Sequence, residues 1–257
     1  MKGMLSLILT MTFCILAVWG FVPRVAQASF SVSPVKAELS PRSQSILMTV
    51  RNPGSRPVRV QARVFEWEQD ANGKEHLTST QDIAYFPQML QVNPGDSGSV
   101  RLGLRVPVAD REKSYRVIFE ELPGTRSVEG PVGAQVMFRQ RLSIPVFVTP
   151  ARIQHQPRVS IDRVAGGRFQ FSIHNDGNAH FLVRSVEIKG LSSSSSNPLL
   201  NGRLDGWYVL PGTPRRHVLR FPQGRCAEID RLQIKVETTE GTVAEEVSFP
   251  RNTACVG

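Results

Sequence analysis

The stretch that decides the fold is Ser114–Pro150, SYRVIFEELPGTRSVEGPVGAQVMFRQRLSIPVFVTP. It predicts a strand at Ser114–Pro123, a loop that contains Gly and Pro, and an unusually long strand at Ala134–Pro150. Apolar residues alternate in the long strand, so one face carries Val136, Phe138, Leu142 and Ile144, with Gln140 interrupting the series. A dozen extended residues span about 40 Å, whereas a usual strand has about 5–6 residues. A strand that outruns its sheet leaves backbone donors and acceptors free to pair with another chain.

Short runs of alternating apolar residues also fill the rest of the chain, separated by Gly, Pro, Asn and Ser at intervals of about 8–12 residues. This spacing indicates β-sandwiches, and the 18 prolines argue against long helices. A polar connector between Pro150 and Pro157 marks a domain boundary. We therefore expect an all-β chain with domains at 29–150 and 151–257, and a flexible loop at the serine run Ser192–Ser196.

Two short sequence patterns, each repeated once, indicate that the two halves are built alike. Asn52-Pro53-Gly54 lies between two apolar runs, and Asn175-Asp176-Gly177 lies between two others at the same spacing. Further along, Pro94-Gly95 and Pro211-Gly212 each precede another apolar run. Two repeated patterns in the same order favour a duplication. An Asn-x-Gly turn between two strands predicts a β-hairpin in each half.

The first 28 residues are typical of a cleavable secretory signal. Lys2 supplies a positive charge, Leu5–Val22 is mostly apolar, and Ala26-Gln27-Ala28 is a small-x-small cleavage site. We expect cleavage after Ala28, and no stable membrane insertion of the remaining chain. An uncleaved anchor is the alternative, because the apolar run approaches the length that spans a bilayer.

The net charge and the cysteines that remain after cleavage bear on the partners and the disulfide bonding of the mature chain. Cleavage removes Lys2 and Arg24 and no acid, so the net charge falls from +9 to +7. The basic residues are scattered and are not interleaved with aromatic residues, which argues against nucleic-acid binding. Cys226 and Cys255 are the two cysteines that remain, and in an oxidising compartment we expect them to form a disulfide. Two unpaired buried thiols are the alternative.

No pattern in the sequence indicates catalysis. His174 and His180 lie six residues apart, but no second pair of ligand residues stands at metal-ligand spacing. The chain has no Gly-x-Ser-x-Gly, His-Glu-x-x-His or phosphate-binding glycine motif. Glu120 and Glu121 are neighbours on a strand, so they point to opposite faces and cannot share a substrate. We expect no enzymatic activity, no metal and no cofactor.

Taken together, the landmarks of this chain resemble those of the PapD-like periplasmic chaperones of the chaperone–usher pathway. The matching features cover essentially the whole mature chain and are Phe30–Leu39, the Asn52-Pro53-Gly54 turn, Leu90–Gly95, Tyr115–Pro123 and the long strand that closes at Pro150. The resemblance implies two immunoglobulin-like β-sandwich domains in tandem, with a cleft between them. It also implies a periplasmic location.

The function implied by the resemblance is the capping of pilus or fimbrial subunits, which the chaperone delivers to an outer-membrane usher. Subunits of this class lack a strand, and the chaperone lends them its own long strand. The donor residues would be Val136, Phe138, Gln140 and Leu142, with Gln140 either weakening the burial or facing a polar notch in the subunit. Core packing within the chain's own domain is the alternative for the apolar residues, and we favour it for Ile144 and Val146.

The resemblance also implies that two cations in the cleft hold the terminal carboxylate of the subunit. Lys36 matches one of them by position. The position of the other is occupied by Pro145, which supplies neither a charge nor a backbone donor. Arg116 and Arg141 are the candidate substitutes, and each is alternatively a solvated surface arginine.

Two other classes of protein fit a chain of two β-sandwiches. One is a structural or adhesive surface protein, which we expect to blunt or complete its sheet edges. The other is a periplasmic ligand-binding module, which we expect to have a cleft lined by aromatic residues. The long edge strand favours the chaperone over both.

Overall fold

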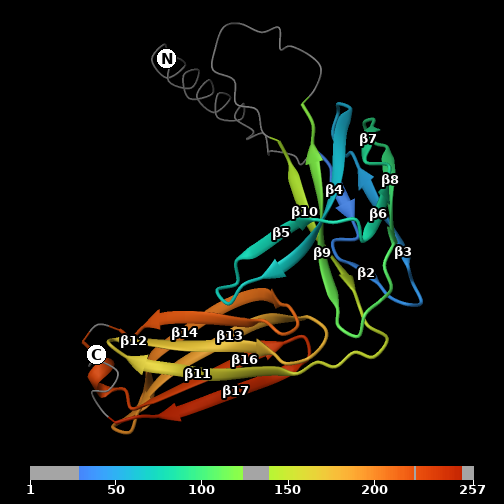
Figure 1. The fold of residues 1–257 in the computed structure, drawn as a ribbon. Helices are drawn as coiled ribbons and strands as arrows, with labels where there is room; N and C mark the ends of the chain where they lie inside the picture. The colour runs from blue at the N-terminus through green and yellow to red at the C-terminus, as the bar shows by residue number, and fades with distance from the viewer. Residues whose placement is uncertain (1–28, 124–138, 223, 251–257) are drawn as a thin grey trace, which may run out of the picture.

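The computed structural model describes residues 29–123, 139–222 and 224–250, and these residues form two β-sandwiches in tandem (Figure 1). The first sandwich contains the strands from β1 to β10, and the second contains those from β11 to β17. The two sandwiches lie at a steep angle to each other and meet where the β4–β5 hairpin reaches the second domain (Figure 1). The predicted all-β, two-sandwich fold is therefore confirmed.

The first domain has two sheets. Sheet I contains, in spatial order, β1 (Ser31–Ser33), β3 (Ser45–Arg51), β8 (Ser97–Leu104) and β6 (Ile83–Phe86). Sheet II contains β2 (Ala37–Leu39), β10 (Arg141–Val148), β9 (Lys113–Glu121), β4 (Val58–Gln69) and β5 (Glu75–Ser79). A further strand, β7 (Met89–Val92), pairs with the start of β4. The strands of sheet II pair antiparallel, except that β2 and β10 are parallel.

The second domain also has two sheets. Sheet III contains β11 (Pro157–Ala165), β12 (Arg168–Asn175) and β15 (Pro214–Arg220). Sheet IV contains β14 (Ser195–Val209), β13 (Phe181–Ser192), β16 (Arg231–Thr238) and β17 (Gly241–Ser248). In the part of the chain that the structure describes, the one helical segment is a short 3-10 turn, η1 (Cys226–Glu228).

Each domain has its own hydrophobic core between its two sheets. The alternating apolar residues of the strands supply it, as in β9, where Val117 and Phe119 are fully buried. Ile144 and Val146 of β10 belong to this core, which confirms the packing expected for them. Leu142 is partly buried against the same core. The second core is built in the same way around the phenylalanines of β12.

Asn52 and Asn175 occupy equivalent corners of the two domains, and both are buried. Each Nδ2 donates to two backbone carbonyls, and each Oδ1 accepts from the N–H of the glycine two residues later. Each backbone carbonyl also accepts from the glycine of the later Pro-Gly turn, at 2.9 Å for Gly95 and 2.8 Å for Gly212. In each domain the Asn-x-Gly motif and the Pro-Gly turn are thus joined by a hydrogen bond, which supports the duplication.

The hairpins predicted at these corners are wrong. β3 and β4 belong to different sheets, and so do β12 and β13. The side-chain amide of each asparagine satisfies carbonyls that a paired strand would otherwise satisfy. Each corner therefore carries the chain across from one sheet of the sandwich to the other.

Other local predictions have mixed outcomes. The flexible loop predicted at Ser192–Ser196 is a tight hairpin turn, because Ser192 of β13 pairs with Ser195 of β14 and only Ser193 and Ser194 lie between the strands. The strand predicted from Ala134 begins at Arg141 in the described residues, and Ala134–Phe138 lies outside them. Cys226 is disulfide-bonded. Its predicted partner Cys255 and the predicted signal, residues 1–28, lie outside the described residues.

Replacing Asn175 with alanine should lower the free energy of unfolding by about 2–4 kcal/mol, because two buried carbonyls lose their donor. Asn201→Ala is the matched control, since Asn201 is exposed and should change stability by less than about 0.5 kcal/mol. Urea unfolding measures both variants. Equal losses in the two would show that the corner has no special role.

Candidate functional site

β10 is paired along one side only for much of its length. β9 follows it from Arg141 to Val148, whereas β2 pairs only with Val146–Val148 on the other side. The carbonyl of Gln140 accepts from the N–H of Glu121 at 3.0 Å, which sets the alternation along the strand. The backbone groups of Arg141 and Ser143 therefore point away from β9. Among the described residues no strand pairs with them there, so the stretch 141–145 is an open edge.

Pro145 lies in the same alternate set as Arg141 and Ser143. Its missing N–H would have pointed to the open edge, so the proline costs sheet II no hydrogen bond with β9. Its carbonyl faces the N–H of Ala37, at the point where the parallel pairing with β2 begins. The open edge thus offers the N–H and C=O groups of Arg141 and Ser143.

The register of sheet II brings two of the predicted cations to opposite sides of Pro145. Arg116 of β9 lies directly across from Pro145, and the two side chains share a face. On the other side, Ala37 of β2 pairs with Val146, so Lys36 adjoins Pro145. Arg141 is exposed and lies four residues further along, or roughly 13 Å. The structure therefore groups Lys36 with Arg116 and leaves Arg141 apart.

Both cations beside Pro145 already have acidic partners. Lys36 Nζ lies 2.6 Å from Glu38, and both side chains are about half exposed. The hydrogen bond to Glu38 raises the pKa of Lys36 against the effect of burial. Arg116 pairs with Glu75 and lies 3.7 Å from the centre of the Trp67 ring, with only 12% of its side chain exposed. Arg116 is thus held in place, whereas Lys36 is open to solvent.

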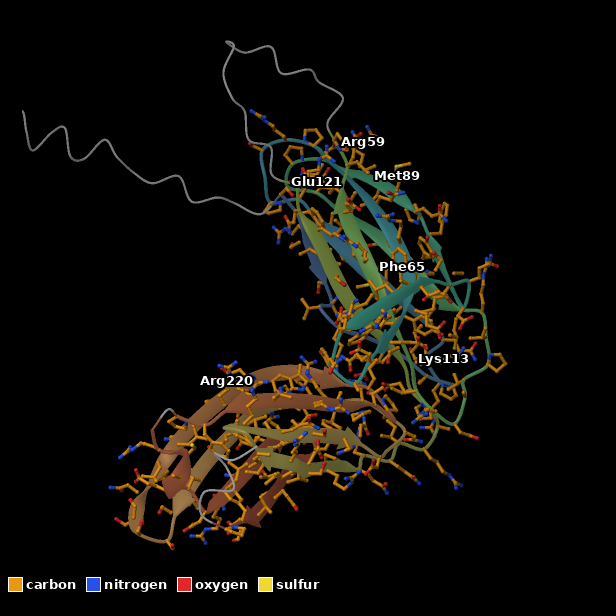
Figure 2. The ribbon with its side chains drawn as sticks, turned by 60° about the vertical axis from the view of Figure 1, so that its left-hand side comes forward. Arg59, Phe65, Met89, Lys113, Glu121 and Arg220 are labelled. Atoms are coloured by element: carbon orange, nitrogen blue, oxygen red, sulfur yellow. The ribbon has the colours of Figure 1, made fainter. Side chains whose placement is uncertain are left out.

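Gln140 closes the end of the first core just before the open edge begins. Its Nε2 donates to the carbonyl of Phe30 at 2.8 Å, and its Oε1 accepts from the N–H of Phe30 at 3.2 Å. Ser29 Oγ donates to Glu121 beside it at 2.6 Å, and Figure 2 shows Glu121 at the end of the first domain far from the second. The amide of Gln140 is therefore satisfied within its own domain. Val136 and Phe138, the other predicted donor residues before Gln140, lie outside the described residues.

At its other end β10 enters the interface between the domains. Phe147, two residues after Pro145 on the same face, stacks on His180 of the second domain at 3.5 Å between ring centres. Trp67 and Tyr208 pack around the same phenylalanine, with Leu210 completing the cluster. One strand therefore provides both the open edge and part of the contact between the domains.

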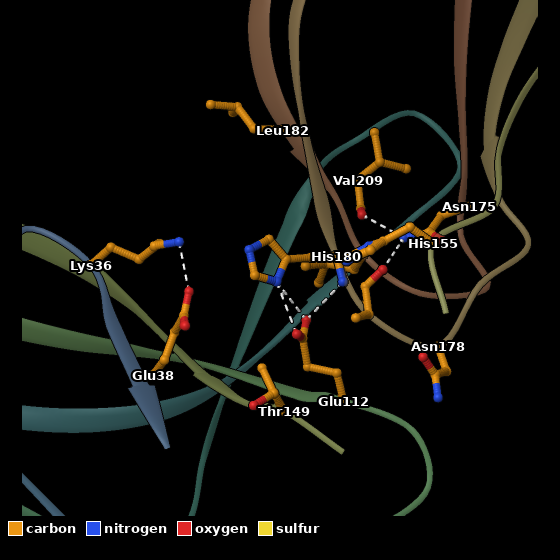
Figure 3. Close-up of polar contacts among 12 residues, drawn as sticks. Lys36, Glu38, Glu112, Thr149, His155, Asn175, Asn178, His180, Leu182 and Val209 are labelled. Atoms are coloured by element: carbon orange, nitrogen blue, oxygen red, sulfur yellow. Dashed lines mark hydrogen bonds and ion pairs between the residues drawn. The ribbon is translucent and has the colours of Figure 1, made fainter. Parts of the chain in front are cut away.

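A buried pair of side chains, Glu112 and His180, links the domains at this point. Nδ1 of His180 lies 2.9 Å from each carboxylate oxygen of Glu112, and the backbone N–H of His180 donates to the same carboxylate at 3.1 Å (Figure 3). The side chain of Glu112 is completely buried, and that of His180 is 12% exposed. The sequence drew attention to His180 only as a metal ligand, and it did not single out Glu112. Glu112 and His180 are 68 residues apart in the sequence, so no local pattern reveals the pair.

The β4–β5 hairpin makes a second link. The Gln69 amide donates to the carbonyl of Tyr208 at 3.1 Å and accepts from the N–H of Leu210 at 3.2 Å, as a neighbouring strand would. At the tip, the carbonyl of Ala71 accepts from the N–H of Arg216 at 2.8 Å. These contacts fix the direction in which β10 leaves the interface.

The described residues contain no group of three or more His, Cys, Asp and Glu side chains placed to hold a metal ion. In the same residues, no helix combines the length and the apolar character that crossing a membrane requires.

Comparison with known proteins relates the first domain to one family. Residues 29–154 match the family model described as "Pili and flagellar-assembly chaperone, PapD N-terminal domain". The match covers the first domain of this chain. It is 26% identical over 133 residues to the "Probable fimbrial chaperone EcpE" of Escherichia coli O127:H6 (strain E2348/69 / EPEC). That alignment covers 51% of this chain and half the length of the relative.

Solved structures share the whole fold. One chain of the complex of CsuC with the tip adhesion subunit CsuE, from the archaic chaperone-usher Csu pili of Acinetobacter baumannii, superposes with a TM-score of 0.60 at 21% identity. It covers 87% of this chain and 99% of the matched chain. The YadV chaperone superposes with a TM-score of 0.56 at 13% identity and covers 86% of this chain and all of its own. These likenesses show that the chain shares the two-domain fold of the solved chaperones.

Glu112→Ala should lower the free energy of unfolding by about 1–3 kcal/mol, because the backbone N–H and the ring nitrogen of His180 lose their buried hydrogen-bond partner. Glu38→Ala provides the contrast, since the Lys36–Glu38 pair is half exposed and should contribute only about 0–1 kcal/mol. Chemical unfolding monitored by tryptophan fluorescence measures both, because Trp67 lies in the interface. A loss for Glu112→Ala no larger than that for Glu38→Ala would contradict the role of the buried pair.

Proposed function

We propose that the protein is a non-enzymatic periplasmic chaperone that caps pilus or fimbrial subunits by donating a β-strand and delivers them to an outer-membrane usher. The observation that carries the proposal is the open edge at 141–145, which lies beside two cations in the angle between the domains. The similar proteins support the proposal, since one is named as a probable fimbrial chaperone and the other is a chaperone in complex with a tip subunit. Periplasmic export rests on the predicted signal in residues 1–28.

The open edge fits strand addition because its pairing groups already have the extended geometry of a sheet. A subunit strand that pairs with Arg141 and Ser143 gains main-chain hydrogen bonds whatever its own sequence is. Sheet II loses nothing, because these groups make no bond to β9. An adhesive surface protein would be expected to cover or complete such an edge, so this feature favours the chaperone.

The donated side chains would precede the closed end of the first core. The side-chain amide of Gln140 hydrogen-bonds to Phe30 of the first domain. Leu142 packs at the margin of the first core. We propose that Val136 and Phe138, earlier in the same alternating series of the sequence, fill the groove of the subunit. Each contributes about 1.5–3 kcal/mol when fully buried.

The terminal carboxylate of the subunit would bind between Lys36 and Arg116. The backbone of a strand added along the open edge ends beside Pro145, and the two cations flank that position. Arg116, held by Glu75 and Trp67, presents its guanidinium with little loss of side-chain freedom. The cation missing at Pro145 is therefore replaced from the neighbouring strand.

Ser143→Pro tests strand addition directly. It removes an N–H that points to the open edge and leaves the pairing of β10 with β9 intact, as Pro145 already does. We expect the variant to fold normally and to lose co-purification with a pilus subunit co-expressed with it. Ser143→Ala is the matched control, which keeps the N–H and should keep the subunit. Undiminished capture by the folded proline variant would rule out pairing at this edge.

The anchor is tested by single substitutions of the three candidate cations. Lys36→Ala and Arg116→Ala should each weaken subunit binding about tenfold to a hundredfold, because a charge-assisted hydrogen bond contributes about 1.5–3 kcal/mol. Arg141→Ala is the internal comparison and should have a much smaller effect, since it lies apart from Pro145. Binding is measured by titration with purified subunit, after melting curves confirm folding. A dominant effect of Arg141→Ala would place the carboxylate elsewhere.

A further inference from the structure

The outer face of sheet III is strongly basic. The register of its three strands places alternating residues on this face, and they include Arg163, Arg168, Arg216 and Arg220. All four are exposed. Among the residues that the structure describes, the arginine ion pairs of the second domain are made by others, namely Arg158, Arg203 and Arg231. The four arginines of this face therefore present their charge to solvent.

Two of these arginines face each other directly. Arg168 of β12 pairs in register with Arg220 at the end of β15, and Figure 2 shows Arg220 at the surface of the second domain. Directly opposite residues have Cβ atoms about 4.5–5.5 Å apart, so two like charges at this position repel and destabilise the sheet. Nothing in the packing of the second core requires an arginine at either position, because both side chains point outward.

The other titratable groups on this face do not neutralise it. Asp162 accepts hydrogen bonds from Ser160, Ser172 and Gln170 rather than from an arginine. Burial raises the pKa of Asp162, but these hydrogen bonds outweigh it, so the carboxylate stays ionised at neutral pH. Burial, assisted by Arg158, lowers the pKa of His174, which is therefore neutral. Arg158 is balanced by Asp176. The face keeps a clear excess of positive charge.

The shape of this face points to the kind of partner. The four arginines are spread over β11, β12 and β15, so their charge covers a sheet surface rather than one point. Val218 stands between Arg216 and Arg220 on the same face of β15 and is 54% exposed. A broad array of guanidinium groups around a protruding apolar side chain suits a planar anionic surface better than a single small ion.

We propose that this arginine face binds the phosphate groups of an anionic lipid surface. Guanidinium groups bind phosphate oxygens through paired hydrogen bonds. A phosphate placed between Arg168 and Arg220 turns their repulsion into two attractive contacts, and Val218 enters the headgroup layer. The proposal is independent of strand donation, because the arginines lie on the second domain and the open edge on the first.

The test measures binding of the purified, exported protein to lipid vesicles by co-sedimentation. Vesicles of phosphatidylglycerol and phosphatidylethanolamine should bind the protein at low salt, vesicles of phosphatidylcholine should not, and added salt should release it. The double variant Arg168→Glu and Arg220→Glu should bind at least about tenfold more weakly. The matched control is Arg51→Glu with Arg101→Glu, which makes the same charge change on exposed arginines of the first domain and should keep binding.

Several outcomes would overturn the proposal. Equal losses in the two double variants would mean that only net charge matters. Absence of binding to the anionic vesicles, or binding to soluble polyglutamate in preference to them, would exclude a lipid surface. A separate readout without lipid is the thermal midpoint of Arg168→Gln, which should rise because the repulsion with Arg220 is removed. A lower midpoint would show that the two arginines do not oppose each other as inferred.

Discussion

The structure depends on the one-sided pairing of β10. Its alternate backbone groups bond to β9, and the remaining groups of Arg141 and Ser143 have no strand partner among the described residues. The same strand continues past Pro145 into the junction of the domains, where Phe147 stacks on His180. Strand donation and domain orientation are therefore coupled by a single rigid element, because the edge that receives a partner and the residue that contacts the second domain are only a few positions apart.

Polar contacts over long sequence separations give this junction its form. The Glu112–His180 pair, the Gln69 amide and the carbonyl of Ala71 all join the first domain to the second. Each satisfies groups that burial between the domains would otherwise leave unpaired. Since the contacts are directional, they restrict the angle between the sandwiches more strongly than apolar packing alone would. The cations beside Pro145 consequently occupy a fixed position relative to the second domain.

Much of the fold was predictable because a strand with one buried face shows an alternation of apolar and polar residues in its own sequence. Alternation of period two identified β9 and the core residues Ile144 and Val146. The Asn corners were recognised as a repeat but misread as hairpins, because the local sequence does not tell whether two successive strands pair with each other or cross between sheets. Glu112 and Gln69 escaped notice because their partners lie 68 and 139 residues away. Only the register of the folded sheet showed that Arg116 lies across from Pro145.

The most direct measurement of the central claim is hydrogen exchange at the backbone N–H groups of Arg141 and Ser143, with and without a bound pilus subunit. In the free protein both should exchange quickly, since they point to the open edge, while Leu142 between them is protected by β9. Subunit binding should slow Arg141 and Ser143 and leave Leu142 nearly unchanged. Protection of Arg141 and Ser143 in the free protein, or continued fast exchange in the complex, would contradict strand addition at this edge.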